Sequence, residues 1–115
     1  MLPKQHRLKK QKDFEKIFEQ GRGARQEEII IRFLPNQKEF SRFGFIVSKK
    51  VSKKAVIRNR IKRLLREATR HILPDLKQGF DVVVIALSGI EKKNFHQIKE
   101  MLFNIFNKVD LIKKK

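Results

Sequence analysis

The stretch GFDVVVIAL, residues 79–87, decides how this chain folds. Its last six residues, Val82 to Leu87, form the longest uninterrupted apolar run in the sequence. Valine and isoleucine favour strands, and a strand that is apolar on both faces is normally interior to a sheet. We therefore expect an interior strand here, opened by Gly79, with other strands on either side of it.

One helix is predicted before this strand in the sequence and another after it. Residues 54–73 carry apolar side chains three and four positions apart, and Pro74 ends the pattern. Residues 93–109 repeat the same spacing. The second helix can begin at Asn94, or after a capping box formed by Ser88 and Glu91.

The first third of the chain predicts one helix and two or three strands. Phe14, Ile17 and Phe18 give a helix over residues 10–20, which we expect Gly21 and Gly23 to end in the left-handed conformation. Strands at 29–34 and 42–48, joined by a turn at 35–38, predict an antiparallel hairpin. The polar stretch 22–26 could add an edge strand. The expected class is α+β, with helices packed on a mixed sheet.

No repeat or linker divides the 115 residues, so we expect a single domain over 1–115 with mobile basic ends at about 1–8 and 111–115. The basic N-terminus lacks the apolar segment of a secretory signal. The chain has no cysteine, which removes disulfides and thiolate metal sites from consideration. We expect a cytoplasmic protein.

Positive charge is the main functional signal. The formal net charge is +17, and residues 49–70 hold ten basic side chains against one acid, Glu67. Arg58, Lys62 and Arg66 are four residues apart and form one stripe of the helix. Like charges at this spacing destabilise a helix, so stability alone does not explain the stripe. The pattern indicates a polyanion partner, and Asn59 could hydrogen-bond a base edge or a 2′-hydroxyl.

The sequence favours RNA over duplex DNA. It shows no helix-turn-helix spacing, zinc-ligand pattern or leucine zipper. Proteins that bind single-stranded RNA stack unpaired bases on aromatic rings, and this chain has neither Trp nor Tyr. Phe14 and Phe18 are the candidate stacking residues, and core packing of the first helix is the equally open alternative.

No catalytic constellation is evident. His6, His71 and His96 are scattered, the aspartates show no metal-binding spacing, and no phosphate-binding glycine loop is present. The residues therefore predict RNA binding without cleavage by this chain. Three alternatives stay open: a ribosomal assembly protein, a free-standing nuclease that uses His71 or His96, and a protein that compacts DNA.

Three segments carry a family resemblance. SKK at 48–50, followed by AVIRNRIKRLLRE at 55–67, resembles the signature of the bacterial ribonuclease P protein subunit, whose RNR motif reads here Arg58-Asn59-Arg60. RLKKQKDFEKIFEQG at 7–21 is similar to the first helix of that family. Two departures are the absence of a glycine just before the RNR helix and the absence of a strand tyrosine, for which Phe33 is the nearest substitute.

The resemblance implies a fold, a partner and a set of contacts. The fold is a single-domain α/β sandwich of the ribosomal S5 domain-2-like type, in the order α-β-β-(β)-α-β-α, with a left-handed βαβ crossover. The chain would assist a catalytic RNA, which holds Mg²⁺ and removes the 5′ leader of precursor tRNA, with no obligate protein partner and no membrane. The residues that the resemblance assigns to RNA binding are Phe14, Phe18, Lys49, Lys50, Arg58, Asn59, Arg60, Lys62, Arg63 and Arg66.

Overall fold

A computed structural model describes residues 2–114 and places the apolar strand β4 (Phe80–Ala86) inside a four-stranded sheet. The strand order is β1-β2-β4-β3, with β1 at Arg22–Gln26, β2 at Ile29–Pro35 and β3 at Arg42–Ile46. β4 is antiparallel to β2 and parallel to β3. The predicted interior strand is confirmed, and so is the edge strand at 22–26.

The predicted hairpin between 29–34 and 42–48 is wrong. β2 forms its hairpin with β1, and β4 lies between β2 and β3. The segment that joins β2 to β3 therefore crosses the end of β4, where a buried carboxylate, Asp81, fixes both of its ends. Asn36 Nδ2 donates to Asp81 Oδ1 at 2.8 Å, and Arg42 donates Nε and Nη2 to the two Asp81 oxygens at 2.9 and 2.6 Å.

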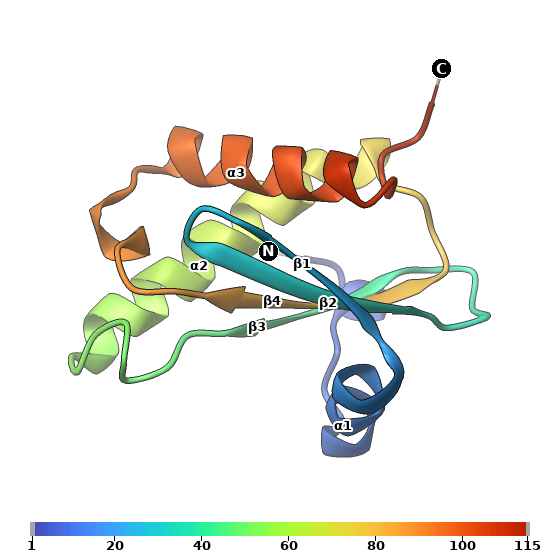
Figure 1. The fold of residues 1–115 in the computed structure, drawn as a ribbon, viewed down its shortest axis with the longest axis horizontal. Helices are drawn as coiled ribbons and strands as arrows, with labels where there is room; N and C mark the ends of the chain where they lie inside the picture. The colour runs from blue at the N-terminus through green and yellow to red at the C-terminus, as the bar shows by residue number, and fades with distance from the viewer. Residues whose placement is uncertain (1, 115) are drawn as a thin grey trace.

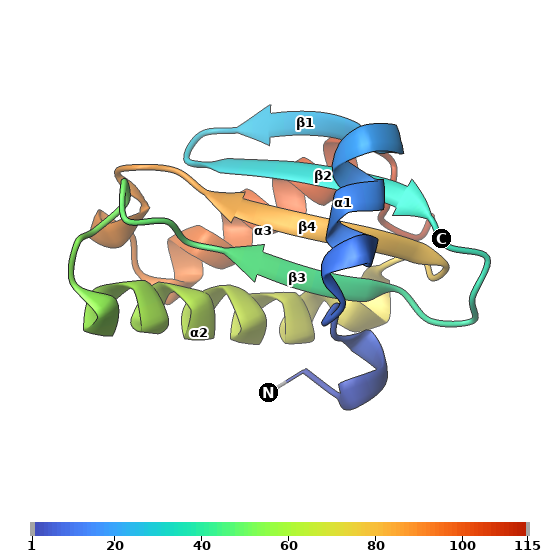
Figure 2. The same cartoon turned by 90° about the horizontal axis from the view of Figure 1, so that it is seen from below.

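Three helices cover the sheet (Figure 1). α2 (Ala55–Ile72) and α3 (Phe95–Lys108) lie on one face, and α1 (Gln11–Gln20) crosses the other. Figure 2 views the α1 side: β3 and β4 point left, β4 lies above β3, and α2 belongs to the layer behind the sheet. A path from β3 through α2 to β4 is thus left-handed, against the usual preference for a right-handed crossover. The element order matches the expected one.

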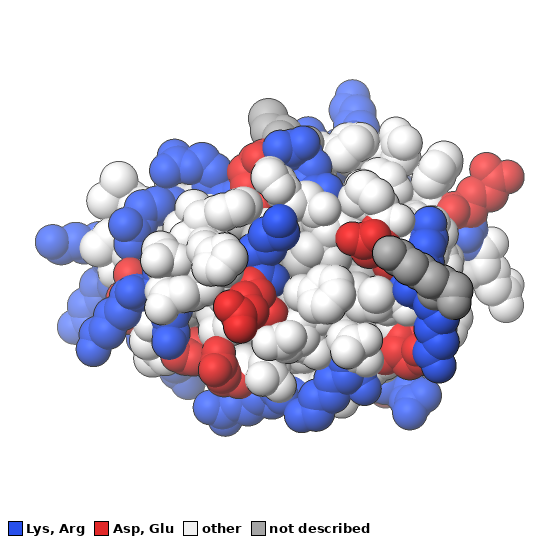
Figure 3. Space-filling view, turned by 90° about the horizontal axis from the view of Figure 1, so that it is seen from above, with Lys and Arg blue, Asp and Glu red and all other residues white. Residues whose placement is uncertain are grey.

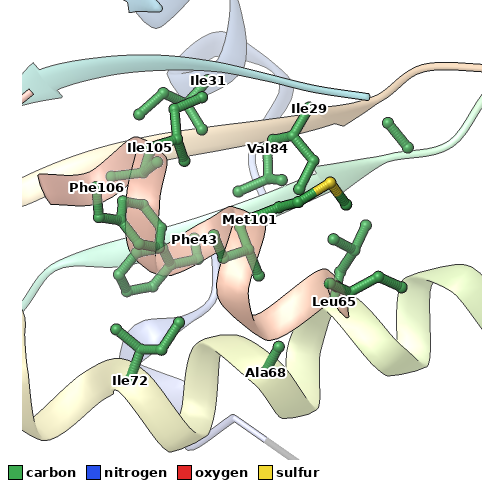
Figure 4. Close-up of a cluster of buried hydrophobic side chains, with 14 of the residues drawn as sticks. Ile29, Ile31, Phe43, Leu65, Ala68, Ile72, Val84, Met101, Ile105 and Phe106 are labelled. Carbon is green, nitrogen blue, oxygen red and sulfur yellow. The ribbon is translucent and has the colours of Figure 1, made fainter. Parts of the chain in front are cut away.

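The larger core fills the space between the sheet and the two helices (Figure 4). Alternate residues of β2 and β4, such as Ile29, Ile31 and Val84, point into it and meet Leu65 of α2 and Phe106 of α3. All five side chains are fully buried, with 0% of their surface accessible to solvent.

Within residues 2–114, no helix is both long enough and apolar enough to cross a membrane.

A smaller core joins α1 to the opposite face of the sheet. Ile17 packs with Leu8 and with Val83 of β4, which is why β4 needs apolar residues on both faces. Phe14 lies over Gly44 of β3: a Cβ at that glycine would stand 2.5 Å from Cε1 and Cζ of the ring. The glycine therefore lets the helix approach the sheet closely.

The structure corrects the expected end of α1 and decides between the two starts proposed for α3. Gly21 follows α1 with φ −77°, which is ordinary extended backbone, so the left-handed conformation does not end the helix. A side chain there would instead collide with the Ile17 carbonyl oxygen. α3 begins at Asn94, whose side chain forms a capping box with Gln97, while Glu91 accepts a hydrogen bond from the Gly89 amide.

The ends of the chain are packed where we expected mobility. Leu2, His6 and Leu8 are buried, and the Leu8 amide donates to the Phe43 carbonyl at 2.9 Å. At the other end Leu111 is 3% exposed. Apolar residues within these basic segments explain the difference, because each finds a place in the core. Met1 and Lys115, which belonged to the same expectation, lie outside the described residues.

The Asp81 contacts predict an unequal response to two isosteric changes. Asp81→Asn leaves the half-buried Arg42 without its main counter-charge, so the free energy of unfolding should fall by about 1–3 kcal/mol. Asp110→Asn removes an exposed carboxylate paired with Lys77, and because solvent screens that pair, the free energy of unfolding should change much less. Urea unfolding of both variants measures the difference, and equal losses would contradict the role assigned to Asp81.

The close approach at Gly44 predicts a coupled pair of substitutions. Gly44→Ala should destabilise the protein by about 1–3 kcal/mol, because the added methyl group overpacks the contact with Phe14. In a Phe14→Ala background the same change should cost clearly less. Urea unfolding of the four proteins gives the coupling energy, and an identical cost in both backgrounds would show that the clash lies elsewhere.

Candidate nucleic-acid interface

Phe14 and Phe18 lie on the same side of α1 but differ in exposure. Phe14 is half-buried because it covers Gly44, and Phe18, one turn later, exposes 42% of its surface. Phe14 therefore packs on the sheet and still exposes part of its ring, whereas Phe18 is available to solvent. The side of α1 that carries Phe14 and Phe18 thus lies next to the sheet face that α2 and α3 leave uncovered.

A pocket of about 170 Å³ brings Phe14 together with the basic helix. Arg66 of α2, Phe14 of α1 and Phe45 of β3 all line it. The remaining lining residues are Leu2, Arg7, Leu8, Lys9, Phe43 and Gly44. Arg7, Lys9 and Phe45 were missed by sequence reasoning, although the first two belong to the basic run that precedes the helix.

The predicted stripe of Arg58, Lys62 and Arg66 follows one flank of α2. Arg58 and Lys62 are half-buried, and Arg66 is exposed where the stripe reaches the pocket beside β3. Arg58 Nη1 donates to the Ser52 carbonyl at 2.9 Å, which ties the start of the helix to the preceding loop. The stripe therefore leads from that loop toward Phe14.

The other predicted residues of the helix point elsewhere. Arg60 Nη2 donates to the Glu91 carbonyl at 3.1 Å, on the flank that faces the start of α3. Asn59 and Arg63 lie exposed between the two flanks. The three side chains of the RNR motif therefore point in different directions from the helix and do not form a single site.

Lys49 and Lys50 occupy the loop after β3 and are both exposed. The Lys50 carbonyl accepts a hydrogen bond from Ser88 Oγ at 2.9 Å, which connects this loop to the segment that follows β4. Both lysines thus extend the basic surface at the end of the sheet where α2 begins (Figure 1).

Arg32 is a further candidate that the sequence reasoning missed. It lies on the α1 face of β2, where Nη2 donates to the Phe18 carbonyl at 2.7 Å and the buried Nε has no hydrogen-bond partner within the described chain. Phe33, offered as a substitute for a strand aromatic, points the other way into the main core and is 6% exposed. Alternation along β2 would have identified Arg32 once Ile31 was assigned to the core.

Charge is distributed unevenly around the molecule. Figure 3 views the α3 face, where uncharged side chains cover most of the middle, with acidic and a few basic ones among them, and most basic side chains lie at the margins. On α2, Arg70 pairs with Glu67 at 2.9 Å, and this hydrogen bond lowers the pKa of Glu67 to about 2. Glu67 therefore stays ionised and neutralises Arg70, whereas Arg58, Lys62 and Arg66 form no ion pair within residues 2–114.

The histidines form no shared site. His6 is buried and its Nδ1 lies 2.7 Å from the Ser41 carbonyl oxygen, while His71 packs edge-on against Phe95. His96 is exposed on α3. Across residues 2–114, no group of three or more His, Cys, Asp or Glu side chains is arranged to hold a metal ion.

Comparison with known proteins assigns the chain to a family. The model of the Ribonuclease P family matches residues 2–110. The ribonuclease P protein component of Dictyoglomus turgidum is 42% identical over 115 residues, covering 98% of this chain and 96% of its own. That of Synechocystis sp. is 41% identical over 112 residues, covering 96% and 90%.

Solved structures agree with the sequence relatives. The RNase P protein of Staphylococcus aureus superposes with a TM-score of 0.85 at 28% identity, covering 94% of this chain and 98% of its own. The RNase P protein of Thermotoga maritima gives a TM-score of 0.81 at 32% identity, covering 89% and 96%. The α+β fold, the basic helix and these matches together show that the chain belongs to the ribonuclease P protein component family, which forms part of an RNA-based tRNA-processing enzyme.

Proposed function

We propose that this chain is the protein subunit of a ribonuclease P that binds both the catalytic RNA and the 5′ leader of precursor tRNA. The RNA performs the endonucleolytic cleavage with the Mg²⁺ that it holds, and the chain acts in the cytoplasm. The observation that carries the proposal is that Phe14 and Arg66 line the same pocket. From Arg66 the row of unpaired cations continues along α2. An aromatic ring beside a row of phosphate-binding groups suits a single RNA strand.

The proposed division of contacts follows the directions of the side chains. Phe14, Phe18 and the flank formed by Arg58, Lys62 and Arg66 border the α1 side of the sheet and would bind the leader. The remaining candidates are exposed, lie outside this flank and would meet the catalytic RNA: Lys49, Lys50, Asn59, Arg60 and Arg63. Arginine suits both surfaces, since its planar fork makes paired hydrogen bonds to phosphate.

Charge explains how such a protein would assist a catalytic RNA. The catalytic RNA and the precursor are both polyanions and repel each other at short range. A protein of net charge +17 between them offsets that repulsion, so less Mg²⁺ is needed for productive binding. Contacts with the leader favour precursor over mature tRNA, because the product lacks the leader.

Reconstitution tests this function. Cleavage of a labelled precursor tRNA at low Mg²⁺ should require the RNA subunit and the protein together. Arg58→Ala and Lys62→Ala should shift the Mg²⁺ titration to higher concentration, because each removes a cation from the unpaired flank. Lys113→Ala is the matched control, since this exposed lysine lies near the C-terminal end of the chain, away from the start of α2 (Figure 1).

Each rival predicts a different result in the same assay. Cleavage by the protein alone, abolished by His71→Ala or His96→Ala, would support a free-standing nuclease. No stimulation at any Mg²⁺ concentration would favour the ribosomal assembly protein. Equal affinity for duplex DNA and RNA would favour DNA compaction. An unchanged Mg²⁺ titration for Arg58→Ala and Lys62→Ala would remove these two residues from the mechanism.

Phe14 should matter for substrates that carry a leader. Phe14→Leu keeps an apolar side chain over Gly44 but removes the ring, so precursor binding by the holoenzyme should weaken about 5- to 100-fold, the loss of one stacked base. Binding of mature tRNA should not change. Phe103→Leu, the same change at an exposed aromatic residue (40%) on α3, is the control. Equal losses for precursor and mature tRNA would return Phe14 to a purely structural role.

A further inference from the structure

A turn follows β4 at the end of the sheet where α2 begins (Figure 1). We call its residues 88–91 the β4–α3 turn. Ile90, inside the turn, is 0% exposed and belongs to the main core, whereas Ser88 is exposed. Gly89 has φ 105°, a conformation that side chains other than glycine rarely adopt. The β4–α3 turn is therefore anchored in the core by one side chain and presents the others at the surface.

The carboxylate of Glu91 closes this turn. Its Oε1 and Oε2 accept from the Gly89 amide at 2.6 and 3.3 Å, a charge-assisted hydrogen bond to the backbone. Glu91 is half-buried and forms no ion pair within residues 2–114. The carboxylate thus maintains the shape of the turn and does not pair with a neighbouring cation.

Two hydrogen bonds connect the β4–α3 turn to two separate basic segments. Ser88 Oγ donates to the Lys50 carbonyl at 2.9 Å, in the loop that follows β3. The Glu91 carbonyl accepts from Arg60 Nη2 at 3.1 Å, on α2. The turn therefore bridges the loop and the helix, and it sets where their cations lie relative to one another.

The loop between β3 and α2, residues 47–54, needs such support. Its Val51 amide donates to the Ser48 carbonyl at 3.1 Å, but the loop has no helix or strand of its own. Like charges close together repel and favour a spread arrangement. The lysines of the loop are all exposed and form no ion pair with any residue from 2 to 114: Lys49, Lys50, Lys53 and Lys54.

We propose that the β4–α3 turn is a positioning element for the catalytic RNA, and that Glu91, although acidic, strengthens the binding of this polyanion. The turn fixes Lys49 and Lys50 relative to Arg60 before the RNA arrives, so less ordering has to be completed on binding. The inference rests on the proposed function for the identity of the polyanion. General electrostatics predicts the opposite sign, since a carboxylate near phosphates weakens binding.

Hydrogen exchange of the free protein tests the positioning without RNA. Glu91→Ala should loosen the turn and with it the loop, so the Val51 amide should exchange faster than in the wild type. Val84, inside β4, is the internal reference and should keep its rate. Glu100→Ala is the matched control, because this exposed carboxylate of α3 lies outside the turn. If Val51 exchanges equally fast in both variants, the turn does not hold the loop and the proposal is overturned.

Affinity for the RNA subunit tests the consequence, and the sign of the change decides. Glu91→Ala should weaken binding about 3- to 10-fold, the loss of one hydrogen bond, even though the net charge rises by one. Glu91→Gln keeps a side-chain oxygen for the Gly89 amide and should bind at least as tightly as the wild type. Glu100→Ala raises the charge equally and should not weaken binding. If Glu91→Ala binds as tightly as Glu100→Ala, charge alone governs the affinity and the proposal is overturned.

A double-mutant comparison separates positioning from a general loss of structure. Ser88→Ala should weaken RNA-subunit binding, and Ser88→Thr, which keeps the hydroxyl, should restore it. In a background that carries Lys49→Ala and Lys50→Ala, Ser88→Ala should have little further effect, because the side chains that it positions are absent. An equal loss in both backgrounds would show that Ser88 acts by another route and would overturn the proposal.

These measurements read affinity and exchange, so they are independent of cleavage. A wild-type protein that binds the RNA subunit without stimulating cleavage would contradict the proposed function. The positioning role of the β4–α3 turn would still be decided by the affinities of the Glu91 and Ser88 variants relative to that wild type.

Discussion

The position of β4 between β2 and β3 is the constraint on which the rest of the structure depends. With β4 central, β2 and β3 cannot pair, and the chain must pass from one side of β4 to the other between them. Asp81 fixes that connection, because it accepts hydrogen bonds from Asn36 and Arg42. The hydrogen bond to Asp81 raises the pKa of the Arg42 guanidinium, so Arg42 keeps its charge. Because β3 and β4 are parallel, their connection needs a helix, and that helix is α2.

The same arrangement positions the candidate site. α2 begins beyond the ends of the parallel strands and runs back along β3, so its basic flank borders the open edge of the sheet (Figure 2). α1 reaches the opposite face only because Gly44 leaves room for Phe14. N-terminal residues Leu2, Arg7, Leu8 and Lys9 line the pocket together with Phe14 of α1 and Arg66 of α2. Three parts of the chain that are far apart in sequence therefore meet at one pocket: the N-terminal part with α1, then β3, then α2. Local sequence spacing cannot reveal such a meeting.

Particular residues show how far sequence reasoning reached. Apolar side chains on both faces predicted that β4 is interior, and helical spacing predicted α2 and α3 to within a residue or two. The hairpin was wrong because adjacent strands usually pair, and only the nonlocal insertion of β4 prevents it here. The packed ends were missed because Leu2 and Leu8 are isolated apolar residues in a basic run. Phe33 and Arg32 differ by one position, and a shift of one residue exchanges the two faces of a strand.

Net charge connects the stability of this fold to its binding. The unpaired cations of α2 repel one another in the free protein, and a core built on both faces of the sheet must outweigh that repulsion. Any polyanion that occupies the basic flank removes the repulsion and adds its own contacts, so it binds the folded chain far better than the unfolded one. The cations that make the free protein less stable are therefore the ones that an RNA partner stabilises most. This explains why the flank of Arg58, Lys62 and Arg66 lacks neutralising carboxylates, whereas outside it Arg42 pairs with Asp81 and Asp13 and Arg70 pairs with Glu67.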